Sequence, residues 1–278
     1  MNTGSERRAP PLDRFRLKNI IILILLLVNG FLLGSLGVRK SAEQEFFRRT
    51  AEQLVGLFEA DGMTLDIYAI SRDTPPAGLT LSRDTALEQR AAAFLLGEAA
   101  ASDDQGGGIY SYESGGGQAL FRSSGGFEAA GRLSEEPEDF CRDFCRTFSY
   151  EEPVFLLDEE GNGSASAVCV RGGLPVFNCT VRFTVEGGCV TAVSGTLLPE
   201  GGVPVQGADE VLSAAGALTA FQRMRRENAA VASSVTGTQL CYELQNTGAA
   251  ISLTPAWRVM TDTADYYVNC VSGTVTTG

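Results

Sequence analysis

The chain has 278 residues, 44% of them hydrophobic, and a formal net charge of −12 from 22 basic and 34 acidic residues. It has no histidine, and its only lysines are Lys18 and Lys40. Imidazole-activated nucleophiles and imidazole metal sites are therefore excluded, as are Schiff-base lysines beyond residue 40. The acidic balance argues against nucleic acid as a partner, because phosphate binding needs clustered positive charge.

The first predicted element is an apolar helix. The nineteen residues from Ile20 to Val38 carry no charge, and at about 1.5 Å per residue they nearly match a bilayer core of roughly 30 Å. The sequence predicts a short basic tail over 1–16 and a transmembrane helix over 17–38. A cleaved export signal is the alternative, but it would have a shorter apolar region and a small-residue cleavage site.

The charge around this helix leaves its orientation nearly undecided. Five basic residues precede the uncharged stretch Ile20–Val38 and four follow it closely, so the positive-inside rule discriminates weakly. Residues 1–40 carry seven basic and two acidic residues, whereas residues 41–278 carry fifteen and thirty-two. This asymmetry is compatible with an exported C-terminal part, although acidic residues contribute little to orientation.

Four residues of the predicted span are candidates for contact with another helix. Gly30 and Gly34 form a small-xxx-small pair that lets a second helix approach closely, and Gly37 repeats the small residue. Asn29 could hydrogen-bond across such a contact. A passive anchor is the alternative, because glycines are common in membrane helices.

Beyond the span, helices alternate with short strands. The amphipathic pattern continues the first helix to Gly62, and glycine-bearing turns separate the strands that follow. Ser134 is predicted to cap the second of the later helices, with Pro137 in its first turn. The predicted elements up to residue 150 are a strand over 63–70, a helix over 84–101, strands over 109–112, 118–122 and 127–133, and a helix over 137–148.

The second half repeats this order. Its predicted elements are strands over 165–170, 176–186 and 189–198, a helix over 209–227 with Val211, Leu212, Ala215, Leu218 and Phe221 inward, and four final strands. The fold class is therefore α+β, with a single transmembrane helix followed by repeated units of helix and antiparallel meander. A cluster of proline, acidic and glycine residues near 150–163 divides the exported part into units 41–150 and 160–278.

Seven cysteines offer the remaining unusual chemistry. On a helix, Cys141 and Cys145 share one face with Phe144 and Phe148, which favours an inward apolar stripe over a redox pair. In the later strands, a two-residue hairpin at 187–188 would pair Glu186 with Cys189 and Cys179 with Thr196. The predicted registers do not bring together Cys169, Cys179 and Cys189, and Cys179 is expected in the core.

No metal, cofactor or catalytic site is predicted. Asp158, Glu160 and Asn162 resemble the opening of a calcium loop, but the position of the closing bidentate carboxylate is Cys169. A turn built on glycine and asparagine explains this loop better. The acidic cluster after Ser134 complements the positive end of a helix dipole, and the glycine runs at 106–108 and 115–117 lack the motifs of phosphate loops.

Three stretches carry a resemblance to a known family. "RLKNIIILILLLVNGFLL" is similar to the start of YycI-type proteins, and "GQALFRSSGGFEAAGRL" resembles the hairpin between the helices of that family. "LTPAWRVMTDTADYYVNCVSGTV", residues 253–275, resembles the ending of PepSY-like extracytoplasmic modules. The related YycH proteins are usually longer, so the length favours the YycI type. The alanine- and glycine-rich middle with its cysteines departs from the family pattern.

The resemblance implies a bacterial single-pass protein of the cell membrane, with its N-terminus in the cytoplasm and its C-terminal part outside. It implies regulation of the sensor histidine kinase WalK (YycG), which controls cell-wall metabolism, with a YycH-like protein as a further partner. The expected mode of action is contact between membrane helices and between exported domains, without catalysis.

Two other functions remain open. A PepSY-type module could bind a ligand or inhibit a secreted enzyme without the helix. A cell-wall hydrolase would need two carboxylates roughly 5 to 9.5 Å apart, and no recognisable motif here places such a pair.

Overall fold

The computed structural model describes residues 14–97, 101–205, 211–228, 231–246 and 251–278, and within them the side chains of all but residues 14–21, 33–43, 101 and 228. The chain forms two compact units, Met1–Gln53 and Leu54–Gly278. Both segments predicted as separate units, 41–150 and 160–278, lie largely in the second. The predicted tail over 1–16 falls mostly outside the described residues.

Helix α1 (Arg14–Ala60) runs without interruption through the predicted span and into the second compact unit. Within the part of the chain that the structure describes, no helix is long and apolar enough to cross a membrane. The side chains of 17–21 and 33–38 in the predicted span lie outside that part. Beyond the span, Glu45 and Arg48 form an exposed ion pair of 3.0 Å one turn apart, which suits a solvated helix surface.

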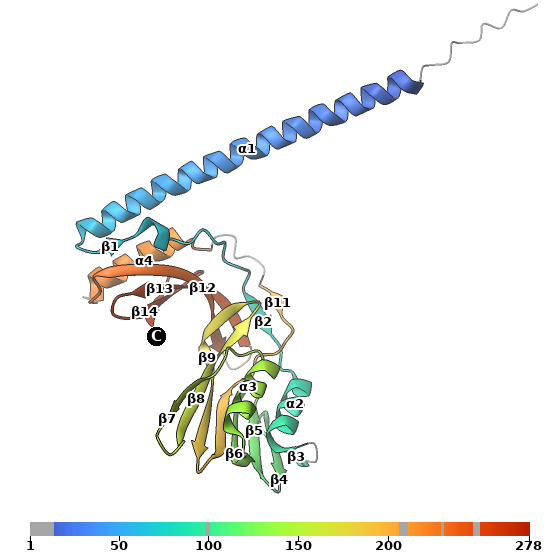
Figure 1. Cartoon of the computed structure of the whole chain (residues 1–278), viewed down its shortest axis with the longest axis vertical. Helices are drawn as coiled ribbons and strands as arrows, with labels where there is room; N and C mark the ends of the chain where they lie inside the picture. Colours follow the sequence, from blue (N-terminus) through green and yellow to red (C-terminus); the bar gives the residue numbers. More distant parts are fainter. Residues whose placement is uncertain (1–13, 98–100, 206–210, 229–230, 247–250) are drawn as a thin grey trace, which may run out of the picture. The chain divides into compact units, whose positions relative to one another are not determined.

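The second unit confirms the α+β class (Figure 1). Its first half contains β1 (Thr64–Leu65), the 3₁₀ helix η1 (Ile67–Ala69), β2 (Leu79–Leu81), α2 (Thr85–Leu96), β3 (Ala101–Gly106), β4 (Ile109–Ser114), β5 (Gly117–Arg122), β6 (Gly126–Ser134) and α3 (Pro137–Thr147). Its second half contains β7 (Val154–Leu157), β8 (Gly163–Arg171), β9 (Leu174–Glu186), β10 (Cys189–Thr196), β11 (Val203–Pro204), α4 (Ala214–Asn228), β12 (Ser234–Asn246), β13 (Ile251–Thr261), β14 (Asp265–Asn269) and β15 (Val275–Thr277).

All these strands belong to one sheet, with the principal order β11-β2-β13-β12-β9-β10-β6-β5-β4-β3. Most neighbours are antiparallel, as predicted. The prediction of purely antiparallel sheets is nevertheless wrong, because β12 pairs in parallel with both β1 and β9. These two pairings join strands that are far apart in the sequence, which a pattern of local hairpins could not indicate.

A first core lies where α2 and α3 cover β4, β5 and β6 together with β8 to β10 (Figure 1). Phe94 of α2 contacts Phe144 of α3 edge to face, with ring centroids 5.5 Å apart. Phe144 also packs on Phe127 and Phe183 of the sheet, at 5.9 and 5.5 Å. The predicted inward stripe on α3 is confirmed, because Cys141, Phe144, Cys145 and Phe148 are all buried.

A second core lies between α4 and the strands β13 and β14 (Figure 1). Phe221 of α4 packs on Tyr266 of β14 at 4.9 Å and on Phe58, in the last turns of α1, at 6.5 Å. Trp257 of β13 is fully buried and donates its indole N–H to the carbonyl of Leu212 at 2.8 Å. Residues 54–70 therefore complete a core whose other members come from the last third of the chain.

Two predicted elements in the first half end earlier in the structure than predicted. The strand predicted over 63–70 is wrong beyond Leu65, because the Asp66 side chain accepts a hydrogen bond from the Tyr68 N–H at 2.9 Å and caps η1. The helix predicted to residue 101 ends at Leu96, where Gly97 takes a positive φ of 87°. By Ala101 the chain is already in β3.

One predicted helix cap and one predicted helix start are also wrong, although α3 begins at Pro137 as predicted. Ser134 closes β6 and accepts a hydrogen bond from the Glu136 N–H, so Glu136 takes the cap position of α3 without a side-chain cap bond. Helix α4 begins at Ala214 instead of 209. The backbone of Leu212 cannot join it, because its N–H bonds to the Cys270 carbonyl and its carbonyl accepts from Trp257.

The pairing of β5 with β6 yields a first test. Gly131 lies opposite Gly117 and has a φ of 147°, and a Cβ at Gly131 would collide with the backbone of residues 116–117. We expect Gly131→Ala to lower the free energy of unfolding by about 2 kcal/mol or more, measured by urea denaturation. Gly116→Ala, where a Cβ meets only ordinary contacts, should change it by less than about 0.5 kcal/mol. Equal effects of the two substitutions would contradict this account.

Candidate functional site

The first candidate site is the apolar segment of α1. Seven consecutive apolar side chains, Ile22 to Val28, are each exposed by 45 to 66%, and Phe31 is exposed by 75%. Seven consecutive helical residues cover every side of the helix, because each is rotated by about 100° from the last. The segment is therefore apolar all round, and a helix of this kind is stable only when lipid or protein covers it.

The predicted contact residues are placed on this helix. Asn29 and Gly30 are exposed, and a Cβ added at Gly30 would meet nothing within 4 Å. A larger side chain at Gly30 is therefore sterically free in the isolated chain. Gly34 and Gly37 also lie in α1, but outside the residues whose side chains the structure describes.

A polar cluster of Asp61, Gln222 and Arg226, which we call the latch, connects the end of α1 to α4. Asp61 follows α1 directly, and its carboxylate accepts hydrogen bonds from the side chains of Gln222 and Arg226, the latter at 2.6 Å. Gln222 is buried, whereas the Arg226 side chain is half exposed. Together with the stacking of Phe58 on Phe221, this latch fixes the last turn of α1 to the second core.

A four-residue segment of β9, Val176–Cys179, joins the two cores, and we call it the junction. Opposite β8 the register slips, so that Val168 faces Thr180 while Cys169 faces Val176. The three residues between these pairs are thus released from β8. The side chain of Asn178 donates to the Leu244 carbonyl at 2.8 Å and accepts from its N–H at 2.7 Å, as a neighbouring strand would.

The other junction residues reach into both halves. Val176 pairs with Tyr242 of β12, and Phe177 stacks on Tyr267 of β14 with ring centroids 3.8 Å apart. Cys179 points to the first core and donates to the Thr196 carbonyl at 3.3 Å. The junction therefore has contacts to the second-core strands on one side and to β10 on the other.

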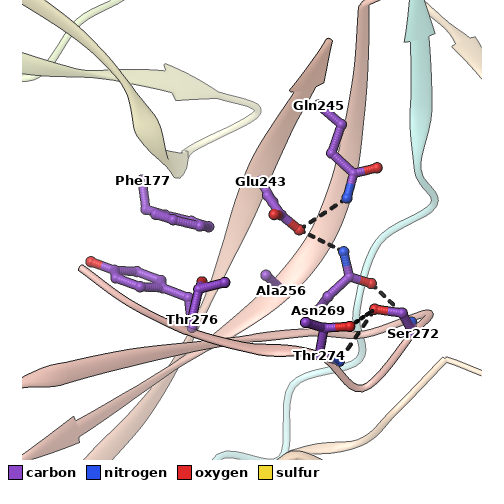
Figure 2. A pocket seen from close by; sticks show the side chains of 9 residues that line it. Phe177, Glu243, Gln245, Ala256, Asn269, Ser272, Thr274 and Thr276 are labelled. Carbon is purple, nitrogen blue, oxygen red and sulfur yellow. Dashed lines mark hydrogen bonds between the residues drawn. The ribbon is translucent and has the colours of Figure 1, made fainter. Parts of the chain in front are cut away.

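A polar hollow of about 120 Å³ lies beside the junction (Figure 2). The Glu243 carboxylate accepts hydrogen bonds from Asn269 at 2.6 Å and from Gln245 at 3.2 Å. The small side chain of Ala256, on the strand between Glu243 and Asn269, leaves the space open. Phe177 forms the opposite wall (Figure 2).

The hollow is better suited to fixing the last hairpin than to binding a ligand. The Asn269 side-chain oxygen accepts from the N–H groups of Val271 and Ser272, each at 3.0 Å, and Ser272 donates to Thr274 at 2.9 Å. These groups satisfy one another. Ligand pockets are usually about 300 Å³ or larger, and Glu243 is the one carboxylate among the residues that line this hollow. It does not supply the paired acids of a hydrolase.

The cysteines form a buried thiol cluster in the first core, which we define as Cys141, Cys145, Cys169 and Cys179. All seven cysteines of the chain are free and buried. Burial raises the pKa of Cys141 and of Cys145 to about 12. The prediction that Cys169 and Cys179 stay apart is wrong, because their side chains hydrogen-bond, and this bond and burial raise the pKa of Cys179.

The slip of register between β8 and β9 at the junction explains why Cys169 and Cys179 come into contact. A further bulge, at Thr191, lets the hairpin pair Glu186 with Cys189 as predicted but sets Gly195 opposite Val181, so Thr196 is not opposite Cys179. Tyr150 closes the cluster by donating its hydroxyl to the Thr196 carbonyl at 2.7 Å, and burial holds its pKa well above the usual range. The cluster is core structure, and the raised pKa values of Cys141, Cys145 and Cys179 keep those three thiols protonated at neutral pH.

The predicted turn at 158–164 is confirmed. The Asp158 side chain accepts from the N–H groups of Glu160 and Asn162, at 2.9 and 2.8 Å. This carboxylate is therefore used to close the turn between β7 and β8.

Several of these residues were not predicted from the sequence. Asn178 lies in an alternating strand pattern that gives no sign of a side chain acting as a strand neighbour. Asn269 does have a sequence signal, because an asparagine before "CVSGT" is typical of a side chain that caps a turn. Asp61 has only its position after the helix as a signal.

Comparison with known proteins adds little. No family model matches the chain, and no curated protein matches it. Among solved structures, an uncharacterized protein from Eubacterium rectale ATCC 33656 is similar over 77% of this chain and 85% of its own, with 10% identity and a TM-score of 0.42. Because this TM-score is low, the likeness carries no argument about fold or function. The resemblance to YycI and YycH stays a prediction.

The hollow yields a second test. Asn269→Leu removes the donor to Glu243 and the acceptor for two backbone N–H groups. We expect it to lower the free energy of unfolding by about 2 to 4 kcal/mol in urea denaturation. Gln245→Ala removes an exposed donor to the same carboxylate and should cost less than about 1 kcal/mol. An Asn269→Leu chain as stable as the wild type would show that the network does not hold the hairpin.

The thiol cluster yields a third test. The thiols of Cys141 and Cys145 keep their protons in the folded chain up to about pH 12, whereas the same thiols in the unfolded chain ionise near the ordinary value of 9.0. The folded state thus binds more protons between these values, so stability is complete below about pH 9 and is lost as the pH rises toward 12. The urea midpoint, measured with reductant, should be constant from about pH 7 to 8 and fall by about pH 10. Cys141→Ala should make this fall shallower, and a midpoint that stays constant to that pH would contradict the assignment.

Proposed function

We propose that the chain is a membrane-anchored regulator of a sensor histidine kinase, of the WalK (YycG) type that controls cell-wall metabolism. In this proposal residues 1–16 are a cytoplasmic tail, 17–38 span the membrane, and the rest of the chain is extracytoplasmic. The observation that carries it is the all-round apolar surface of Ile22–Val28 on a continuous helix. Lipid is the simplest cover for such a surface.

The attachment of α1 to the rest of the chain supports a regulatory role. Phe58 and Asp61 fix the end of α1 to α4 through one aromatic contact and two side-chain hydrogen bonds. Helix α4 in turn packs on the sheet through Phe221 and Tyr266. A partner that shifts α1 would therefore move α4 and the second core with it, and a partner that binds the extracytoplasmic part would act on α1.

The mode of action we propose is contact without catalysis. The hollow beside the junction offers a single carboxylate already bonded by Asn269 and Gln245. The thiols of the cluster are buried, and the raised pKa values of Cys141, Cys145 and Cys179 make these three poor nucleophiles. A YycH-like protein is the second partner that the sequence resemblance implies.

The membrane contact yields a fourth test. We expect Asn29→Leu to weaken co-purification of the full-length chain with its kinase by about 3- to 30-fold, because an interhelical hydrogen bond in a membrane contributes about 0.6 to 2 kcal/mol. Gly30→Leu should weaken it at least as much, since the isolated chain leaves space for that side chain and only a closely packed partner would be displaced.

Val28→Leu is the matched control, because Val28 lies on the opposite side of α1 from Gly30. It should leave co-purification unchanged. Kinase capture that is equal for the wild type and all three variants would reject the helix contact. Capture retained when residues 17–38 are replaced by an unrelated span would reject it independently.

A further inference from the structure

Strand β7 forms an open edge of the sheet. In the part of the chain that the structure describes, β7 pairs with β8 alone (Figure 1). In an antiparallel pair, every second residue directs its N–H and C=O groups away from the partner strand. Along β7 these groups form a row of backbone donors and acceptors that another strand can bind.

Large apolar side chains are exposed on this edge strand. Val154 and Leu156 are exposed by 62 and 71% on one face of β7. The residues opposite them on β8 are Ser166 and Ser164, so the adjoining face of the sheet is polar. Phe155 points to the other face, where it packs against the first core and lies 5.7 Å from the Arg142 guanidinium.

Edge strands usually carry features that prevent pairing, such as charged side chains or bulges. The opposite end of the sheet has such protection, because the outermost strand β3 reads "ASDDQG" with Asp103 and Asp104 exposed. Strand β7 reads "VFLL" and pairs with β8 without a bulge. It therefore has the chemistry of a strand that accepts a partner.

Acidic residues at both ends of β7 restrict the partner. Glu151 and Glu152 precede the strand, and Glu159 and Glu160 follow it, all with exposed side chains. A second copy of β7 in antiparallel pairing would place acidic ends against acidic ends, and such like-charge contacts disfavour pairing. A strand with basic ends would match instead.

We propose that β7 is a docking edge for an extended strand of another polypeptide, with alternating apolar residues and Lys or Arg at both ends. The strand joins the sheet through backbone hydrogen bonds, and its apolar residues cover Val154 and Leu156. This docking depends neither on the identity of a kinase nor on the location of α1 in a membrane.

The test uses the full-length chain in lipid nanodiscs and a fluorescent peptide of alternating valine and threonine with two lysines at each end. We expect binding that weakens with salt, and at least about tenfold weaker binding of the same peptide with glutamates in place of the lysines. Leu156→Lys should weaken binding of the lysine peptide by about tenfold or more, because it adds a positive charge and removes apolar contact. Val231→Lys, at a loop residue exposed by 82%, is the matched control and should bind like the wild type.

Three results would overturn the proposal. The first is absence of binding, which would leave the acidic ends as residues that protect the edge from aggregation. The second is equal binding of the lysine and glutamate peptides, or equal effects of Leu156→Lys and Val231→Lys. The third is dimerisation of the wild-type chain that Leu156→Lys abolishes, which would identify a second copy as the occupant. Far-UV circular dichroism of both variants confirms that each is folded before binding is compared.

Discussion

The fold of residues 54–278 depends on the junction, the segment Val176–Cys179 of β9. Here the register of β9 against β8 slips, and the released residues connect the two cores. Asn178 is central, because its side-chain amide makes the two hydrogen bonds to Leu244 that a neighbouring strand would make. Without these contacts, one parallel bridge, between Val176 and Tyr242, would be the remaining hydrogen-bonded pairing between β9 and β12 in the described chain.

The junction matters because most residues of the first core lie, in the sequence, between the two parts of the chain that form the second core. The chain leaves the second core after η1, builds most of the first core between β2 and β10, and returns to the second core with α4. Tyr242, Ile251 and Leu253 of β12 and β13 complete the first core. The pairing of β1 with β12 and the stacking of Phe58 on Phe221 close this path. The end of α1 is thereby built into the core formed by the last third of the chain.

Local patterns in the sequence predicted the elements well and their connections poorly. The alternation in β9 correctly placed Cys179, Val181 and Phe183 inward, and the spacing on α3 correctly gave its buried face. The register slip, the parallel pairings of β12 and the contact between Cys169 and Cys179 depend on residues far apart in the chain, so no local pattern could indicate them. The start of α4 was misjudged because the backbone of Leu212 is already hydrogen-bonded to Cys270 and to the Trp257 side chain.

The candidate sites also differ in whether the sequence alone reveals them. The apolar helix with Asn29 and Gly30 was evident from composition, because an uncharged run needs no tertiary information to be recognised. The open edge at β7 could not be predicted, since exposure of "VFLL" depends on which strand ends the sheet. We propose both sites as contact surfaces, whereas the hollow and the thiol cluster belong to the internal structure of residues 54–278.

The most direct test is to measure whether the two cores unfold together. Trp257, the one tryptophan of the chain, reports on the second core by its fluorescence. The thiol cluster reports on the first core by its reaction with a thiol reagent, followed for each cysteine by mass spectrometry so that Cys241 and Cys270 are read separately. In urea the two signals should give the same midpoint in the wild type, and Asn178→Ala should separate them or lower both together. Two separate transitions in the wild type, with no effect of Asn178→Ala on either, would show that the cores are independent and contradict the account.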